Sequence, residues 1–145
     1  MSWNSDTASA TMTAQQFKIV LQVTKEVHSV PEERFAAAEI PPEHTTEILR
    51  FAREIRKALS AGGVEVHFVS PDPSDRRTLR IREPSEAEGS GENPREFPSD
   101  VARHWRSLIN VTVASLGPDE LRFRTGYGKA EVDSASSPLG ALFGG

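Results

Sequence analysis

The order of the periodic segments predicts an α+β fold in which two helices cover one face of a four-stranded, mainly antiparallel sheet. Two segments with a helical stripe, residues 45–61 and 99–116, alternate with four segments whose apolar residues occur at every second position. The order strand, helix, strand, strand, helix, strand is that of a ferredoxin-like split βαβ sandwich. The alternative is a ubiquitin-like β-grasp, with residues 17–24 and 26–30 as its first hairpin and residues 99–125 as a helical extension.

The composition is that of one folded domain. The chain has 145 residues, of which 37% are hydrophobic, and no segment approaches the roughly 18 apolar residues of a membrane-spanning helix. We expect a single α+β domain at residues 15–128, a flexible N-terminal tail at 1–14 and a flexible C-terminal tail at 129–145. The polar segment Met1–Thr7 does not resemble a secretory signal, so we expect a cytoplasmic protein without a membrane partner.

The first strand is predicted at residues 17–24, where apolar and mostly polar residues alternate. The apolar positions are Phe17, Ile19, Leu21 and Val23. Residues 26–30 continue as a second extended piece. Pro31 then favours a short helical turn through Phe35, because proline suits the first position of a helix.

The helix at residues 45–61 has one apolar stripe and one charged side. The stripe consists of Ile48, Phe51, Ala52, Ile55 and Leu59. Thr45 or Thr46 can cap its start, and Gly62-Gly63 can end it in the left-handed conformation that glycine tolerates.

A hairpin follows this helix. Val64, Val66 and Phe68 alternate with Glu65 and His67, and a turn rich in proline and aspartate separates them from a partner strand at residues 78–82. An acidic insertion then spans residues 83–98. It holds five glutamates and one arginine, a net charge of −4 that equals the net charge of the whole chain. Its content of Pro, Gly, Ser and Glu predicts disorder.

The second helix is predicted from Ser99 or Asp100 to Leu116, where Gly117-Pro118 ends it. Its buried stripe includes Trp105, Leu108 and Ile109. A last short strand is predicted at Leu121 and Phe123, and the pattern is lost from Gly126 onward.

The predicted strands place six basic residues on the sheet face away from the helices. They are Lys18, His67, Arg80, Arg82, Arg122 and Arg124. Arginine binds phosphate and carboxylate well, so this face is a candidate site for an anion or a nucleic acid. Nucleic acid is the less favoured partner, because the face lacks aromatic residues that would stack on bases. The alternative is a solvated polar face without a ligand.

The C-terminal tail is a candidate docking peptide. Polar residues lead into an apolar plug, Leu139, Leu142 and Phe143, which is suited to a groove on a partner. The alternative is that the plug packs on its own domain. The terminal Gly144-Gly145 resembles the end of ubiquitin-like modifiers, whose terminal carboxylate is adenylated by an activating enzyme; the resemblance is limited to these two residues.

Catalytic and metal motifs are missing from the sequence. The absence of cysteine excludes disulfides, thiolate catalysis and cysteine-ligated metals. His28, His44, His67 and His104 are not spaced as metal ligands, and no nucleotide-binding or nucleophile motif occurs. We therefore expect no cofactor and no enzymatic activity. The expected function is that of a small binding or assembly module, with a protein partner or self-assembly through its sheet face and C-terminal tail.

Overall fold

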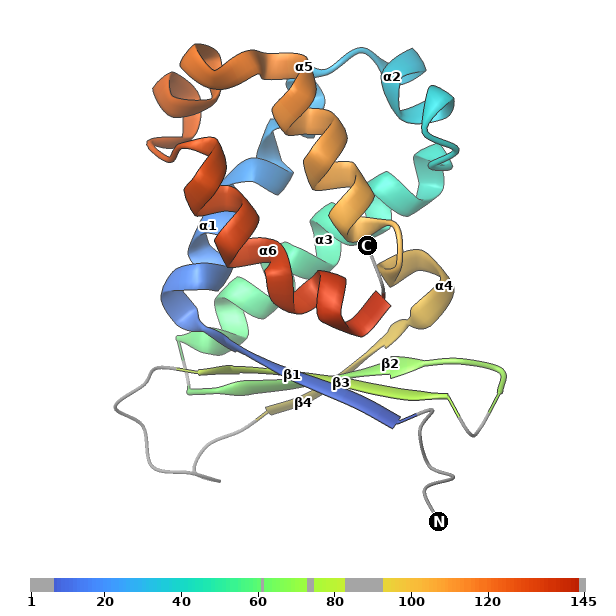
Figure 1. The fold of residues 1–145 in the computed structure, drawn as a ribbon. Helices are drawn as coiled ribbons and strands as arrows, with labels where there is room; N and C mark the ends of the chain where they lie inside the picture. The colour runs from blue at the N-terminus through green and yellow to red at the C-terminus, as the bar shows by residue number, and fades with distance from the viewer. Residues whose placement is uncertain (1–6, 61, 73–74, 83–92, 144–145) are drawn as a thin grey trace.

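A computed structural model describes residues 7–60, 62–72, 75–82 and 93–143, and it shows a four-stranded open sheet with several helices on one side of it (Figure 1). The α+β class is therefore confirmed. None of the helices in the described residues has the length and apolar character needed to cross a bilayer. In chain order the elements are β1 (Thr7–Thr13), α1 (Ala14–Lys25), the 3-10 helix η1 (Glu26–Ser29), α2 (Glu32–Ala37), α3 (Pro42–Leu59), β2 (Val64–Val69), β3 (Arg76–Arg82), β4 (Asn93–Pro98), α4 (Ser99–Ala102), α5 (Trp105–Thr125) and α6 (Lys129–Phe143).

The sheet has the strand order β1-β3-β2-β4 and mixed strand directions. β1 runs parallel to β3, β3 antiparallel to β2, and β2 parallel to β4. The sheet therefore departs from the ferredoxin-like arrangement, in which neighbouring strands are antiparallel. The physical reason is that the edge strands, β1 and β4, come from segments other than those predicted. Each of them runs parallel to the strand beside it.

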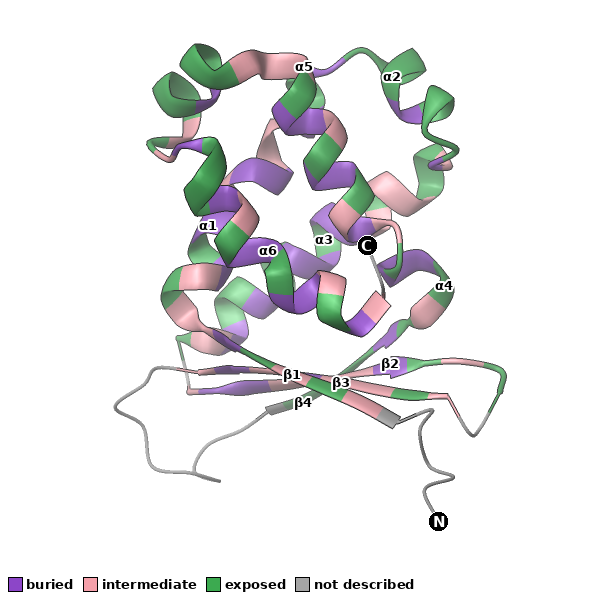
Figure 2. Ribbon diagram, viewed as in Figure 1, coloured by how far each residue is buried: buried purple, intermediate pink, exposed green. Residues whose placement is uncertain are grey.

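The central hairpin of β2 and β3 is as predicted. Its inward residues form the floor of the core, and each is at most 3% exposed: Val64, Val66, Phe68, Leu79 and Ile81. The register places Val66 opposite Leu79 and Val64 opposite Ile81, so the buried positions of the two strands share one face. The helices cover this face (Figure 2).

The helix predicted at residues 45–61 is α3. Its predicted stripe is buried at Ile48, Phe51, Ala52 and Ile55. The Phe51 ring stacks on Phe97 of β4, with 4.1 Å between ring centroids, which ties the helix to the sheet.

The strand predicted at residues 17–24 is wrong, because this segment is the helix α1. Val20 and Thr24 are buried together with the predicted apolar positions, so α1 is enclosed on most sides and shows no single stripe. Its start is a capping box. The Thr13 hydroxyl accepts from the Gln16 backbone N–H at 3.0 Å, and the Gln16 side chain accepts from the Thr13 N–H at 2.9 Å.

The second extended piece, residues 26–30, is also wrong. Glu26–Ser29 forms η1, which continues directly from α1. The hairpin of the β-grasp alternative is therefore absent, because both of its predicted strands are helical. The short turn predicted after Pro31 is confirmed as α2.

Both edge strands were missed. The predicted flexible tail at residues 1–14 contains β1, whose small residues bury little surface apart from Met12. The predicted disordered insertion at 83–98 contains β4 at its end; residues 83–92 lie outside the described residues. β4 carries Pro94 and Pro98, and a strand with proline is stable at a sheet edge because one side needs no N–H donors.

The second predicted helix is present as α4 and α5. Gly117 leaves the helical conformation with φ of 80°, as expected for a glycine stop, but Pro118 starts a further helical stretch to Thr125. The strand predicted at Leu121 and Phe123 is therefore wrong. Residues two apart on a helix point in different directions, and accordingly Leu121 is buried whereas Phe123 is 85% exposed.

The flexible tail predicted at 129–145 is wrong for the residues that the structure describes. Residues 129–143 form α6, which packs on α1, α5 and β1. Small side chains such as Ala135 and Ser136 are buried in this interface. The many small and polar residues of this segment suggested a flexible linker. Small side chains also allow a helix to pack closely against its neighbours, and that is their role in α6.

Candidate functional site: the open face and edges of the sheet

The sheet has a second face that no described helix covers (Figure 1). Alternation along the strands assigns to it the polar positions of β2 and β3 together with Ser9 and Thr11 of β1 and Glu96 of β4. We call this surface the open face. Its members on the central hairpin are Glu65, His67, Arg76, Thr78, Arg80 and Arg82.

Four residues of the open face form one hydrogen-bonded network. Arg80 Nε donates to Glu65 Oε2 at 2.8 Å, and His67 Nε2 lies 3.1 Å from Glu65 Oε1. The other ring nitrogen of His67 lies 3.5 Å from the Thr78 hydroxyl. The register produces this network, because Glu65 is opposite Arg80 and His67 is opposite Thr78.

The hydroxyl, imidazole and carboxylate of this network follow the order of a nucleophile, a base and a group that orients the base. Their side chains are only partly enclosed by the protein. The side chains of His67 and Arg80 are 45% and 44% exposed, and Glu65 already neutralises Arg80. A nucleophile of this kind works in a site that excludes water and supplies donors to the developing charge. The open face therefore presents an ordered pattern of charges and hydroxyls to solvent.

The six predicted basic residues do not share this face. His67, Arg80 and Arg82 lie on it as predicted, whereas Lys18 lies on α1, and Arg122 and Arg124 lie on α5. The prediction of one common arginine-lined face is wrong because two of its strands are helices. The sequence did indicate the correct side for the residues of the central hairpin.

Arg124 is held in an ion pair on the helical side. Its Nε donates to Glu120 at 2.7 Å, and its Nη1 lies 3.4 Å from Glu26 of η1. The hydrogen bond that Arg124 donates to Glu120 raises the pKa of the Arg124 guanidinium above its ordinary value. Arg124 therefore links the end of α5 to η1.

The apolar plug of the C-terminal segment packs on its own domain. Leu139 and Leu142 are 1% and 2% exposed. Phe143 lies edge-on to Phe68 of the sheet at 5.1 Å, and the Arg77 guanidinium lies 5.0 Å from the centre of the Phe143 ring. Arg77 also donates to the Leu142 carbonyl. Leu139 and Leu142 are thus unavailable to a partner while α6 is folded; Gly144 and Gly145 lie outside the described residues.

The histidines do not converge with acids on a metal site. Within the described residues, no group of three or more His, Asp or Glu side chains could hold a metal ion. His44 and His104 lie near each other, with ring centroids 5.0 Å apart. Burial lowers the pKa of His104 below its ordinary value, and the proximity of His44 lowers it further.

The two edges of the sheet differ in their chemistry. β4 carries two prolines, Arg95 and Glu96, which are features that keep an edge strand from pairing with another chain. β1 has the sequence Thr-Ala-Ser-Ala-Thr-Met-Thr, without charge or proline. In the described residues β1 pairs with β3 alone, so its outer edge has no strand beside it. The sequence contained this signal, but the small residues of β1 were interpreted as a tail.

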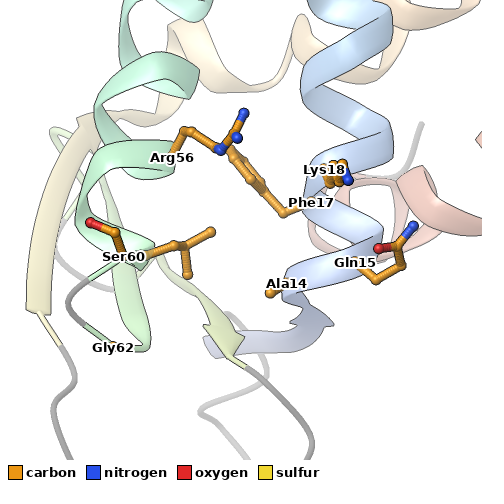
Figure 3. A pocket seen from close by; sticks show the side chains of 8 residues that line it. Ala14, Gln15, Phe17, Lys18, Arg56, Ser60 and Gly62 are labelled. Atoms are coloured by element: carbon orange, nitrogen blue, oxygen red, sulfur yellow. The ribbon is translucent and has the colours of Figure 1, made fainter.

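Lys18, the predicted residue that lies on α1, lines a pocket of about 360 Å³ between α1 and α3 (Figure 3). Arg56 extends from α3 toward α1 on the other side of this pocket. The sequence pattern placed Lys18 on a strand and did not single out Arg56, because the relation between the two residues depends on the packing of α1 as a helix against α3.

Comparison with protein-family models, with curated proteins and with solved structures finds no match to this chain.

Proposed function

We propose that this protein is a non-catalytic assembly module that pairs with a second copy of itself through the outer edge of β1. The observation that supports this proposal is the contrast between the two sheet edges. An unpaired strand exposes N–H and C=O groups that can bond to another strand, and proteins usually protect such edges with proline or charge. β4 has both kinds of protection and β1 has neither.

The sequence of β1 fits a two-fold pairing with itself. A two-fold axis perpendicular to the sheet makes the two β1 strands antiparallel and keeps both helical layers on the same side. With Ala10 opposite Ala10 of the second copy, Ala8 lies opposite Met12, and Ser9 lies opposite Thr11. Apolar residues then meet apolar residues on the covered face, and hydroxyls meet hydroxyls on the open face.

The helix beside this edge is compatible with a close neighbour. α6 packs on β1, and small uncharged residues recur on its exposed side at Ala130, Ser134, Ser137 and Ala141. A second copy paired at β1 would bring its own α6 near this side, and the exposed charges of the helix, Lys129 and Glu131, lie in its first turn. The pairing would also join the two open faces into one continuous surface of eight strands.

A non-catalytic role is supported by the exposure of the Thr78–His67–Glu65 network. The His67 and Glu65 side chains are 45% and 22% exposed, and the carboxylate is shared with Arg80. The network suits a surface that must keep a fixed pattern of charges, and it lacks the enclosure that acid–base catalysis requires.

Sedimentation equilibrium tests the proposed pairing. Dimers should form at protein concentrations between roughly 1 μM and 1 mM, which correspond to about −8 and −4 kcal/mol of association free energy. In the double variant Ser9→Lys/Thr11→Lys, each lysine faces a lysine of the second copy, so the dissociation constant should rise at least about tenfold.

The control variant Thr46→Lys/Ser107→Lys adds the same charge at exposed positions on α3 and α5, and it should dimerise like the parent protein. Circular dichroism and thermal unfolding would establish that both variants are folded. A parent protein that stays monomeric over this range, or two variants that weaken the dimer equally, would refute the pairing.

A further inference from the structure

Two pockets with basic lining residues lie between α3 and the segment formed by α1 and η1. The first, of about 360 Å³, is lined by Lys18 of α1 and by Arg56 near the end of α3 (Figure 3). The second, of about 470 Å³, lies between η1 and α3 and is lined by Arg50, Arg53 and Lys57. We call the two pockets together the α1–α3 groove.

The charge of this groove is opposite to that of the whole chain. Five lysines and arginines line its pockets together with one acid, Glu54, whereas the chain carries a net charge of −4. Helical geometry explains the concentration. Arg50, Arg53 and Lys57 are three or four residues apart on α3, so successive turns present them on one exposed side. Arg56 flanks this row on the side toward Lys18.

Several cations elsewhere in the described structure are paired with acids. Arg77, Arg80, Arg124 and Lys129 are each bonded to a carboxylate. Within the described residues, none of the five groove bases forms an ion pair with an acid. The groove therefore holds a local excess of positive charge that a bound anion would neutralise.

The lining of the groove suits a ligand with several negative charges. Arginine presents two parallel donors to a phosphate or a carboxylate, and three of the five bases are arginines; a phosphate group carries more charge than a carboxylate and gains more from such a cluster. Phe17 and Leu59 supply apolar wall to the first pocket, and Val27 and Leu49 to the second, which strengthens the local field. Phe17 is buried in the wall of the first pocket, and the exposed imidazole of His28 is the aromatic ring at the second, so the groove offers many more charged donors than stacking surfaces.

We propose that the α1–α3 groove binds a ligand with two or more phosphate groups, which contact Arg56 and Lys18 in the first pocket and Arg53 in the second. Arg50 and Arg56 are about 9 Å apart along the axis of α3, so neighbouring phosphates of one ligand can occupy both pockets. Such a ligand is either a free oligophosphate or the backbone of a nucleic acid. This site uses none of the residues of the β1 edge and does not depend on the proposed self-association.

Titration calorimetry with sodium tripolyphosphate, and fluorescence anisotropy with a labelled DNA duplex of random sequence, would test the site at low salt. The variant Arg53→Gln/Arg56→Gln removes one arginine from each pocket. It should bind the phosphate probe roughly 10- to 100-fold more weakly, because each charge-assisted hydrogen bond is lost. The control Arg34→Gln/Arg103→Gln removes the same charge from exposed positions outside the groove and should leave the affinity within about twofold.

The outcomes separate the two phosphate sources. Binding of tripolyphosphate that only the groove variant weakens supports a free oligophosphate ligand. Binding of DNA alone, with a steep salt dependence and the same selective loss, supports a nucleic-acid backbone. The proposal is overturned if neither probe binds, if both variants weaken binding equally, or if citrate or polyglutamate binds as tightly as tripolyphosphate at equal ionic strength.

Discussion

Leu79 and Thr78 are adjacent on β3, and their side chains lie on opposite faces of the same sheet. Leu79 is 1% exposed beneath the helices, whereas the Thr78 hydroxyl lies 3.5 Å from His67 in the polar network of the open face. On the covered face, each side chain is fixed by packing on all sides. On the open face, the side chains are ordered by hydrogen bonds in solvent, where each bond contributes little to stability. The covered face therefore contributes most of the folding free energy, whereas the open face contributes polar groups that can contact a partner.

Single substitutions at Leu79 and Thr78 test this difference between the two faces. They should give the largest difference in unfolding free energy among the predicted stability effects. Leu79→Ala should lower the free energy of unfolding by about 2–5 kcal/mol, because it removes buried surface and leaves a cavity. Thr78→Ala should lower it by no more than about 1 kcal/mol. Urea denaturation followed by circular dichroism measures both values. Similar losses for the two variants would show that the open face is covered in the folded protein.

The covered side also contains a fully buried hydrogen bond between distant residues, and a second matched pair of substitutions tests its contribution. The Thr24 hydroxyl donates to the Val20 carbonyl at 2.7 Å and accepts from Trp105 Nε1 at 3.1 Å. The Thr112 hydroxyl is equally buried but bonds only to the Leu108 carbonyl, four residues earlier in its own helix. The Trp105 bond therefore distinguishes two otherwise similar threonines.

Thr24→Val should cost about 1–3 kcal/mol of unfolding free energy, because it leaves the buried Trp105 N–H without an acceptor. Thr112→Val removes a hydroxyl whose carbonyl partner keeps its helical bond, so it should change stability by less than about 1 kcal/mol. Chemical denaturation of both variants gives the comparison, and Trp105 fluorescence reports the local change. Equal costs would mean that the bond from Trp105 contributes nothing measurable.

The sequence was informative where one face of an element is buried. Ile48, Phe51 and Ile55 form a stripe on α3, and Val64, Val66 and Phe68 alternate on β2, so the period identifies both the element and its inner side. The same logic correctly placed His67 and Arg80 on the open face.

The secondary structure was predicted wrongly for elements that are buried on nearly all sides and for elements whose small side chains bury little surface. α1 is enclosed by α3, α5 and α6, so Val20 and Thr24 are buried with Phe17 and Leu21, and the helical period is obscured. Its capping box, Thr13 with Gln16, was the local signal for a helix. β1 and α6 consist largely of small residues, whose burial depends on the approach of distant segments and leaves little pattern in the sequence.

The candidate sites show the same limit. The contrast between β1 and β4 is visible in their composition, but only the strand order shows that both are edges. The α1–α3 groove depends on packing that joins residues 18 and 56, and the incorrect strand at 17–24 had assigned Lys18 to the sheet. Local periodicity assigns a side chain to a face of its own element; it does not determine which element faces it.

The smallest effect in this comparison is expected at the ion pair of the open face. Glu65 and Arg80 are opposite each other on β2 and β3, and their side chains are 22% and 44% exposed. A double-mutant cycle with Glu65→Gln and Arg80→Gln should give a coupling energy of about 0.2–1 kcal/mol that decreases as salt is added, because solvent screens the pair. Urea denaturation at low and high ionic strength measures it. A coupling well above this range, or one that salt leaves unchanged, would indicate that the pair is shielded from water and that another surface covers the open face in solution.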